Sequence, residues 1–121
     1  MILVDTSVWI DHLRSREDAV EFLLKRKQLL LHPFVIGEIA LGNLKDGDAI
    51  LDMLSKLPQA ATASQEEFLF LIRQYSLLGS GIGFVDAHLL ATAKLKQQAR
   101  VWTRDKRLAK VALRLDVAYE P

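Results

Sequence analysis

The feature that most constrains the fold is an alternation of short apolar runs with amphipathic stretches along the chain. The run "ILVD" is short, continuous and β-branched, as expected of a strand buried on both faces. The expected strands are 2–5, "QLLLHP" at 28–33, a weak "AATA" at 60–63, "RVWT" at 100–103 and "LDVAY" at 115–119. The expected helices are 7–14, 17–27, 34–43, 46–57, Ser64 to about Leu78, 84–98 and 105–114.

This alternation predicts a three-layer α/β/α sandwich around a parallel sheet of four to five strands. The length of 121 residues predicts one domain, 1–121. Right-handed crossovers bring the carboxyl ends of all strands to one edge of such a sheet. Ligands of open α/β sheets bind at that edge, so candidate functional residues are sought there.

Composition excludes several classes of function. Sixteen Lys and Arg against fifteen Asp and Glu leave a net charge of +1, so a nucleic-acid surface would need local clustering of cations. The absence of cysteine excludes disulfides, thiolate metal sites and cysteine nucleophiles. No apolar stretch reaches the roughly 20 residues of a membrane span, so a cytoplasmic protein without membrane contact is expected.

Four acidic residues occupy positions that suit a ligand site. Asp5 follows the first strand and Asp105 follows "RVWT", while Asp86 falls in the first turn of a helix. Glu38 has apolar neighbours at helical spacing. A structural role is open for each: Asp5 and Asp105 as helix caps, Asp86 as an acid at a helix N-terminus, and Glu38 as a solvated edge residue.

Asp5 is not needed as a helix cap, because Thr6 and Ser7 are equally good caps. Capping by either of them could leave the Asp5 carboxylate free. In the predicted fold all four acids could converge on one cleft. Several like charges in one pocket repel one another unless a cation is present. Oxygen-only ligands favour Mg²⁺, with Mn²⁺ as the other candidate.

The motifs "VDTSVWI", "GFVDAHLLATA" and "WTRDKRL", with a mid-chain Glu38 between the first two, resemble the PIN domain. Within that family they are similar to the VapC toxins of bacterial toxin–antitoxin pairs, over essentially the whole chain. The resemblance implies a PIN-like sheet with the first strand in its middle and a Mg-dependent endoribonuclease. It also implies inhibition by a cognate VapB-type antitoxin and a homodimer.

The resemblance assigns the catalytic and metal-binding roles to Asp5, Glu38, Asp86 and Asp105. Thr6, Ser7 and Thr103 match hydroxyl positions that would orient the acids or waters. Water attack assisted by Mg²⁺ would cleave the RNA phosphodiester in line and leave a 5′-phosphate and a 3′-hydroxyl.

For the histidines, the tryptophans and the cations near Asp105 we expect the following positions and roles. His12 and His32 are expected at the surface and in a turn, and His88 is expected to point away from the site. Trp9 and Trp102 are expected in the core. Arg104, Lys106 and Arg107 flank Asp105 and are the candidate RNA-binding residues, with Arg104 favoured.

Four other hypotheses are weighed against the metal nuclease. A non-catalytic PIN-like module that binds RNA or protein would be signalled by loss of an acid, and none is missing. A response-regulator receiver needs an Asp on a middle strand, and "AATAS" has none. A dehalogenase-like phosphatase needs a second Asp where Ser7 stands. Acid–base catalysis through the RNA 2′-hydroxyl would need two converging histidines.

Overall fold

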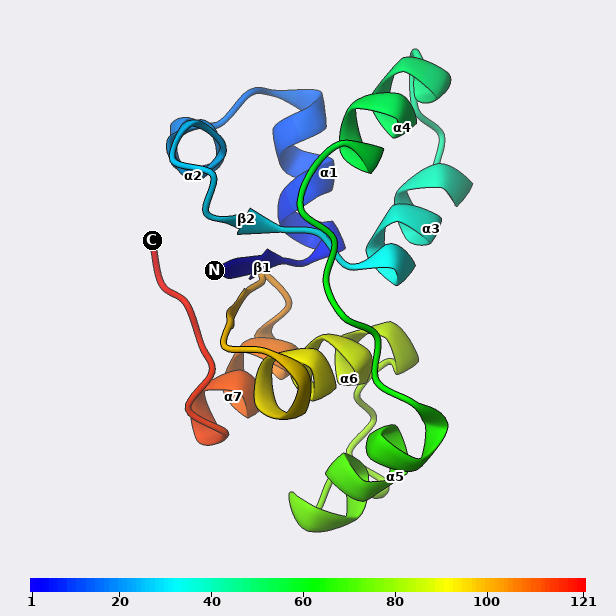
Figure 1. The fold of residues 1–121 in the computed structure, drawn as a ribbon, viewed down its shortest axis with the longest axis vertical. Helices are drawn as coiled ribbons and strands as arrows, with labels where there is room; N and C mark the ends of the chain where they lie inside the picture. Colours follow the sequence, from blue (N-terminus) through cyan, green and yellow to red (C-terminus); the bar gives the residue numbers. More distant parts are fainter.

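A computed structural model describes all residues, 1–121, as a small parallel sheet between two groups of helices (Figure 1). The strands are β1 (Ile2–Val4), β2 (Leu29–Leu30) and β3 (Arg100–Trp102), paired in parallel in the order β2-β1-β3. The predicted central position of the first strand is therefore confirmed.

Helices α1 (Thr6–Arg14), α2 (Asp18–Lys25), α3 (Pro33–Leu41) and α4 (Gly47–Ser55) lie on one side of the strands in Figure 1. The other side carries α5 (Gln65–Gln74), α6 (Phe84–Ala91), the π-helix η1 (Thr92–Lys96) and α7 (Lys106–Arg114). These seven α-helices match the seven predicted helices, with the predicted 84–98 divided between α6 and η1. No helix is long and apolar enough to cross a membrane.

The sheet has three strands, so the predicted four or five are wrong as regular strands. The segments beyond its two edges form single parallel bridges, Leu31 with Gln59 and Val101 with Ala118. The bridge at Ala118 is all that forms of the predicted strand 115–119, and residues 60–63 form none.

The backbone pairing beside β2 ends at Ala60, whose N–H donates to the Leu31 carbonyl (2.8 Å), and side chains hold the next residue, Ala61. The Ala61 N–H donates to Oε1 of Gln97 (2.6 Å), and the Ala61 carbonyl accepts from the hydroxyl of Thr92 (2.6 Å). Thr92 begins η1 and Gln97 ends it, and the Gln97 N–H donates to the Thr92 carbonyl (3.1 Å). Both polar groups of Ala61 are therefore satisfied without a β-ladder.

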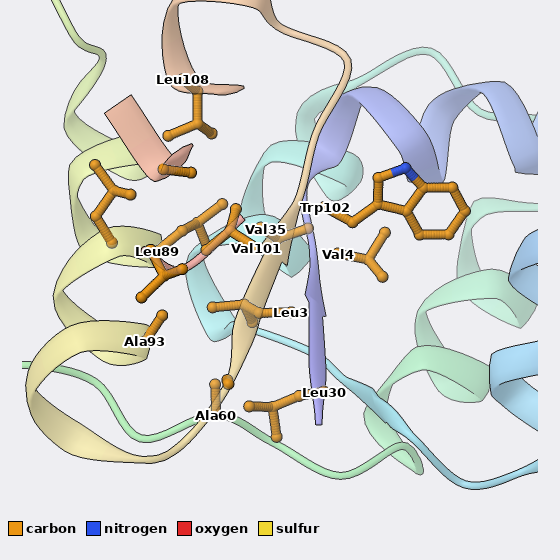
Figure 2. Packing of buried hydrophobic residues seen from close by; sticks show 14 of the residues in the cluster. Leu3, Val4, Leu30, Val35, Ala60, Leu89, Ala93, Val101, Trp102 and Leu108 are labelled. Atoms are coloured by element: carbon orange, nitrogen blue, oxygen red, sulfur yellow. The ribbon is translucent and has the colours of Figure 1, made fainter. Parts of the chain in front are cut away.

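The core fills the space on both faces of the strands, as the alternation of side chains in a strand requires. Figure 2 shows Leu3 and Val101 on the side of Leu89 from α6, while Val4 and Trp102 lie on the side of α1. All five of these side chains, like Trp9, are at least 97 % buried. The predicted core positions of Trp9 and Trp102 are confirmed.

Replacing Thr92 by Val should lower the free energy of unfolding by about 1 kcal/mol, because it removes the hydrogen bond to Ala61 and keeps the side-chain shape. Urea unfolding followed by circular dichroism measures the change. Thr62→Val is the control, since Thr62 is exposed and makes no side-chain hydrogen bond. Equal stability of both variants would contradict a holding role for Thr92.

Candidate metal centre

Asp5 lies where β1 ends and is 96 % buried. Its N–H donates to the carbonyl of Trp102 (2.9 Å), so the pairing of β1 with β3 continues to this residue. Its Oδ1 accepts from the N–H of Thr6 (2.7 Å), which makes Asp5 the N-cap of α1. The expectation that Thr6 or Ser7 caps the helix and leaves Asp5 free is wrong, because α1 begins one residue earlier than predicted.

Two hydroxyl groups hold the second oxygen of Asp5. Ser7 Oγ (2.8 Å) and Thr103 Oγ1 (2.6 Å) both donate to Oδ2. Each hydroxyl also accepts a backbone N–H, Ser7 from Arg104 (3.0 Å) and Thr103 from Asp105 (3.0 Å). The start of α1 and the segment after β3 are thereby joined around one carboxylate, of which only Oδ1 retains a free lone pair.

Glu38 is exposed on α3, one turn after Phe34. Its Oε1 accepts from the hydroxyl of Thr6 (2.6 Å) at the first turn of α1. The contact of α1 with α3 places this carboxylate near Asp5 without burying it. The structure therefore supports the solvated position for Glu38, at the edge of the same site.

Asp105 is exposed and is the N-cap of α7, where its Oδ1 accepts from the N–H of Leu108 (2.9 Å). Its Oδ2 makes no hydrogen bond within the protein. Asp105 therefore caps a helix and keeps one carboxylate oxygen without a hydrogen bond.

Asp86 lies in the first turn of α6, which begins after Gly83. Burial and, in decreasing order, the negative charges of Asp5, Asp105 and Glu38 together raise its pKa to about 7. A Cβ at Gly83 would come within 3.3 Å of Asp86 Oδ2, so this carboxylate lies against the backbone that precedes the helix. The carboxylates of Asp5, Asp105 and Glu38 are therefore near enough to Asp86 to disfavour its charged form.

A pocket opens at this edge of the sheet, lined by Gly81, Ile82, Gly83, Asp86, Asp105, Lys106 and Arg107. Arg107 Nη1 donates to the carbonyl of Gly81 (2.9 Å), which holds the loop before α6 against the start of α7. Gly81 has a φ of +77°, which favours glycine, and a Cβ there would approach Arg107 Nη1 to 2.7 Å. The sequence alone does not reveal this contact, because Arg107 and Gly81 lie 26 residues apart.

The donor chemistry of the site suits a hard divalent cation. All four candidate ligands are carboxylates, and their repulsion at Asp86 is what a cation would relieve. As the side chains stand, no three acidic or histidine residues form a group that could hold one ion together. The type of donor atom, and not the present spacing of the side chains, is what suits Mg²⁺ or Mn²⁺.

The three predicted RNA-binding cations are placed differently. The Arg104 guanidinium pairs with Asp11 (2.7 Å) and, through both terminal nitrogens, with Glu17. Lys106 and Arg107 instead line the acidic pocket. Arg104 therefore forms ion pairs within the protein, which the run of charges in the sequence did not reveal.

None of the three histidines makes a hydrogen bond or ion pair with the four acids. His12 is only partly exposed, and its Nδ1 accepts from the Glu17 N–H (3.0 Å), so its predicted surface position is wrong. His32 precedes α3 and His88 lies in α6, and both are buried. Burial lowers the pKa of His32 to about 4 and also lowers the pKa of His88, so both are neutral at pH 7.

Comparison with known proteins places this arrangement in a family. The family model of the PIN domain matches residues 2–113. This chain belongs to the PIN-domain family.

Two known proteins are similar to this PIN domain. Ribonuclease VapC32, found in two strains of Mycobacterium tuberculosis, is 48 % identical over 108 residues, which are 89 % of this chain and 87 % of that protein. The crystal structure of PAE2754 from Pyrobaculum aerophilum superposes with a TM-score of 0.64. It covers 95 % of this chain and 94 % of its own at 18 % identity, so it supports the fold alone.

Replacing Asp86 by Asn should stabilise the protein above pH 7. The folded-state pKa of Asp86 lies above its ordinary 3.8, so its ionisation removes stability as the pH rises from about 4 to about 7. Asn cannot ionise, and the expected gain near pH 8 is about 1–2 kcal/mol after allowance for solvent screening.

Urea unfolding at a series of pH values, without divalent cations, measures this gain. The stabilities of the two proteins should converge near pH 4, where Asp86 is protonated in both the folded and the unfolded states. Asp48→Asn, at an exposed position in α4, is the control and should show no such pH dependence. A constant difference at all pH values would contradict the raised pKa.

Proposed function

We propose that this PIN domain is a Mg-dependent endoribonuclease and the toxin of a type II toxin–antitoxin pair. The observation that carries the proposal is the placement of the four acids: Asp86 and Asp105 line one pocket, while Asp5 and Glu38 are held by hydroxyls at the start of α1. The charges of the other three acids contribute to the raised pKa of Asp86. Such a concentration of negative charge is unfavourable for folding and suits a bound cation. The similarity to Ribonuclease VapC32 supports RNA as the substrate.

In this proposal Asp5, Glu38, Asp86 and Asp105 hold one or two Mg²⁺ ions, with Mn²⁺ as a substitute. Bound Mg²⁺ would supply an activated water and stabilise the charge that develops on the scissile phosphate. In-line attack leaves a 5′-phosphate and a 3′-hydroxyl. This chemistry needs no protein nucleophile, in keeping with the absence of cysteine.

The neighbouring hydroxyl groups keep the acids in place for this task. Ser7 and Thr103 fix one oxygen of Asp5, and Thr6 fixes one oxygen of Glu38. Each carboxylate therefore starts from a defined orientation, which lowers the cost of ordering it when a cation binds.

Lys106 and Arg107 are the cations that we propose for RNA phosphates, since both line the pocket. Arg104, favoured from the sequence, would have to release Asp11 and Glu17 before it could bind RNA. It is therefore the least favoured of the three.

The proposed partners follow from the family. A cognate VapB-type antitoxin would inhibit the nuclease, and the toxin itself would be a homodimer. A non-catalytic PIN-like module that binds RNA or protein is the alternative function. Retention of all four acids favours the nuclease over that module. Catalysis by paired histidines is disfavoured, because His32 and His88 are buried and neutral.

Induced expression of the wild-type chain and of Asp5→Asn, with sequencing of cellular RNA 5′ ends, tests the nuclease. Asn caps a helix as well as Asp does, so the fold should survive. Cleavage should fall on the order of 100-fold or more, since loss of mere supporting partners of a metal site costs about 10- to 100-fold.

The matched control is Asp48→Asn, which should cleave RNA like the wild type because Asp48 lies on α4, outside the site. Equal cleavage and equal growth arrest by wild type and Asp5→Asn would overturn the metal-nuclease proposal. Cleavage products that carry a 2′,3′-cyclic phosphate would overturn the water-attack mechanism.

Metal binding itself has a separate test in the thermal midpoint of the purified protein. Mg²⁺ should raise the midpoint of the wild type, because a ligand at 100 times its Kd adds about 2.7 kcal/mol of stability. Glu38→Gln and Asp86→Asn should each reduce this rise. A midpoint that does not respond to Mg²⁺ or Mn²⁺ would count against the cation.

A further inference from the structure

Five rings from three parts of the chain form one aromatic cluster: His32, Phe34 in α3, Phe68 in α5, and Phe84 and His88 in α6. His88 lies at its centre. Its ring stacks on Phe68 with centroids 4.1 Å apart and meets Phe84 and Phe34 edge-on at 4.7 and 4.8 Å. Contacts of this kind hold each ring in a fixed orientation.

Phe84 is the exception in the burial of this cluster. His32, His88 and Phe68 are buried, and Phe34 is partly buried, but 60 % of Phe84 is exposed to solvent. Its ring packs 5.1 Å from Phe68 and lies nearly parallel to Phe34, with 19° between the planes. Phe84 is therefore packed against other rings of the cluster while most of its own surface remains exposed to solvent.

The cluster adjoins the acidic pocket through two helices. Phe84 opens α6 directly after Gly83, against whose backbone the Asp86 carboxylate lies. Phe34 lies one turn before Glu38 in α3, so the two share a helix face. Two of the four proposed metal ligands therefore share a helix with a ring of the cluster. Asp86 and Phe84 lie in α6, and Glu38 and Phe34 lie in α3.

We propose that Phe84 is a stacking platform for an unpaired nucleobase of the RNA, next to the phosphate that is cut. This inference deepens the proposed function, because it rests on RNA as the substrate and specifies a single-stranded or flipped-out base. Aromatic side chains stack on bases of every type, since each base presents a π-face.

Charge around the pocket favours a nucleotide over a protein partner as the occupant. Lys106 and Arg107 stand on the pocket wall opposite the start of α6, where they can hold phosphates beside the acidic centre. If a phosphate of the RNA lies in the pocket, the base of the same nucleotide can reach the rim of the pocket. Phe84 is a 60 % exposed ring in the segment that forms this rim, directly after the pocket residue Gly83.

RNA affinity in a Glu38→Gln background tests the platform without cleavage. The probes are a short single-stranded oligoribonucleotide and an abasic oligomer of the same length and charge, with binding measured by fluorescence anisotropy. Adding Phe84→Ala should weaken binding of the oligoribonucleotide at least about fivefold, the lower end of the loss for one base–aromatic stack. Binding of the abasic oligomer should not change.

Conservative variants separate stacking from mere apolar contact. Phe84→Tyr and Phe84→Trp should retain the affinity, whereas Phe84→Leu should lose it despite a similar apolar character. Phe70→Ala is the matched control, since Phe70 is 52 % exposed on α5 and borders a hollow lined by Glu66 and Glu67. It should bind RNA like the parent.

The outcomes distinguish this inference from the proposed nuclease. RNA binding and cleavage that are unaffected by Phe84→Ala would overturn the platform and leave the nuclease standing. If the Glu38→Gln protein binds no RNA and the wild type cleaves none, both the platform and the nuclease proposal are overturned. Unchanged RNA affinity together with a change in oligomeric state, measured by analytical ultracentrifugation of Phe84→Ala, would show that this ring belongs to an interface between copies and would also overturn the platform.

Discussion

The parallel pairing of β1 with β3 is the interaction on which the site depends. It joins residues almost a hundred positions apart and extends one step past the regular strand, through the hydrogen bond from the Asp5 N–H to the Trp102 carbonyl. Asp5 and Thr103 are thereby placed side by side at the carboxyl ends of adjacent strands. The hydroxyl contacts of Ser7 and Thr103 with Asp5 follow from this register, and a slip by one residue would remove them.

Around this pairing the protein gathers like charges that oppose its own folding. The cost is concentrated at Asp86, which is half-buried and faces three other acids. The hydrogen bonds by which Asp5 and Asp105 cap their helices offset part of this unfavourable free energy. Capping by Asp5 and Asp105 does not move them from the carboxyl edge of the sheet, so the observed caps do not count against the proposed ligand role.

The order of elements and the four acids could be predicted from the sequence, because the signals for each are local. The apolar runs mark the strands, and Asp5, Asp86 and Asp105 stand beside strand ends or helix starts. The strand count could not be predicted in the same way. The backbone of Ala61 is satisfied by Thr92 and Gln97, and nothing within "AATA" indicates that side chains so distant would take the place of a neighbouring strand.

Similar reasoning explains the errors in the details of the site. Arg104 looked like a free cation because Asp11 and Glu17, its partners, are close to it only in space. The aromatic cluster was not seen because its rings come from three helices and each Phe is unremarkable in its own segment. Sequence patterns reveal what lies along one element, whereas these features depend on contacts between elements.

The π-helix η1 has a consequence for how the chain can vary in length. Thr92, at the start of η1, and Gln97, its extended C-cap, hold the two polar groups of Ala61 from the two ends of the π turn. The separation of these two side chains therefore depends on the number of residues in the turn. Loss of a single residue would shift Gln97 relative to Thr92 and break at least one of the two contacts with Ala61. The turn should therefore tolerate substitution better than deletion.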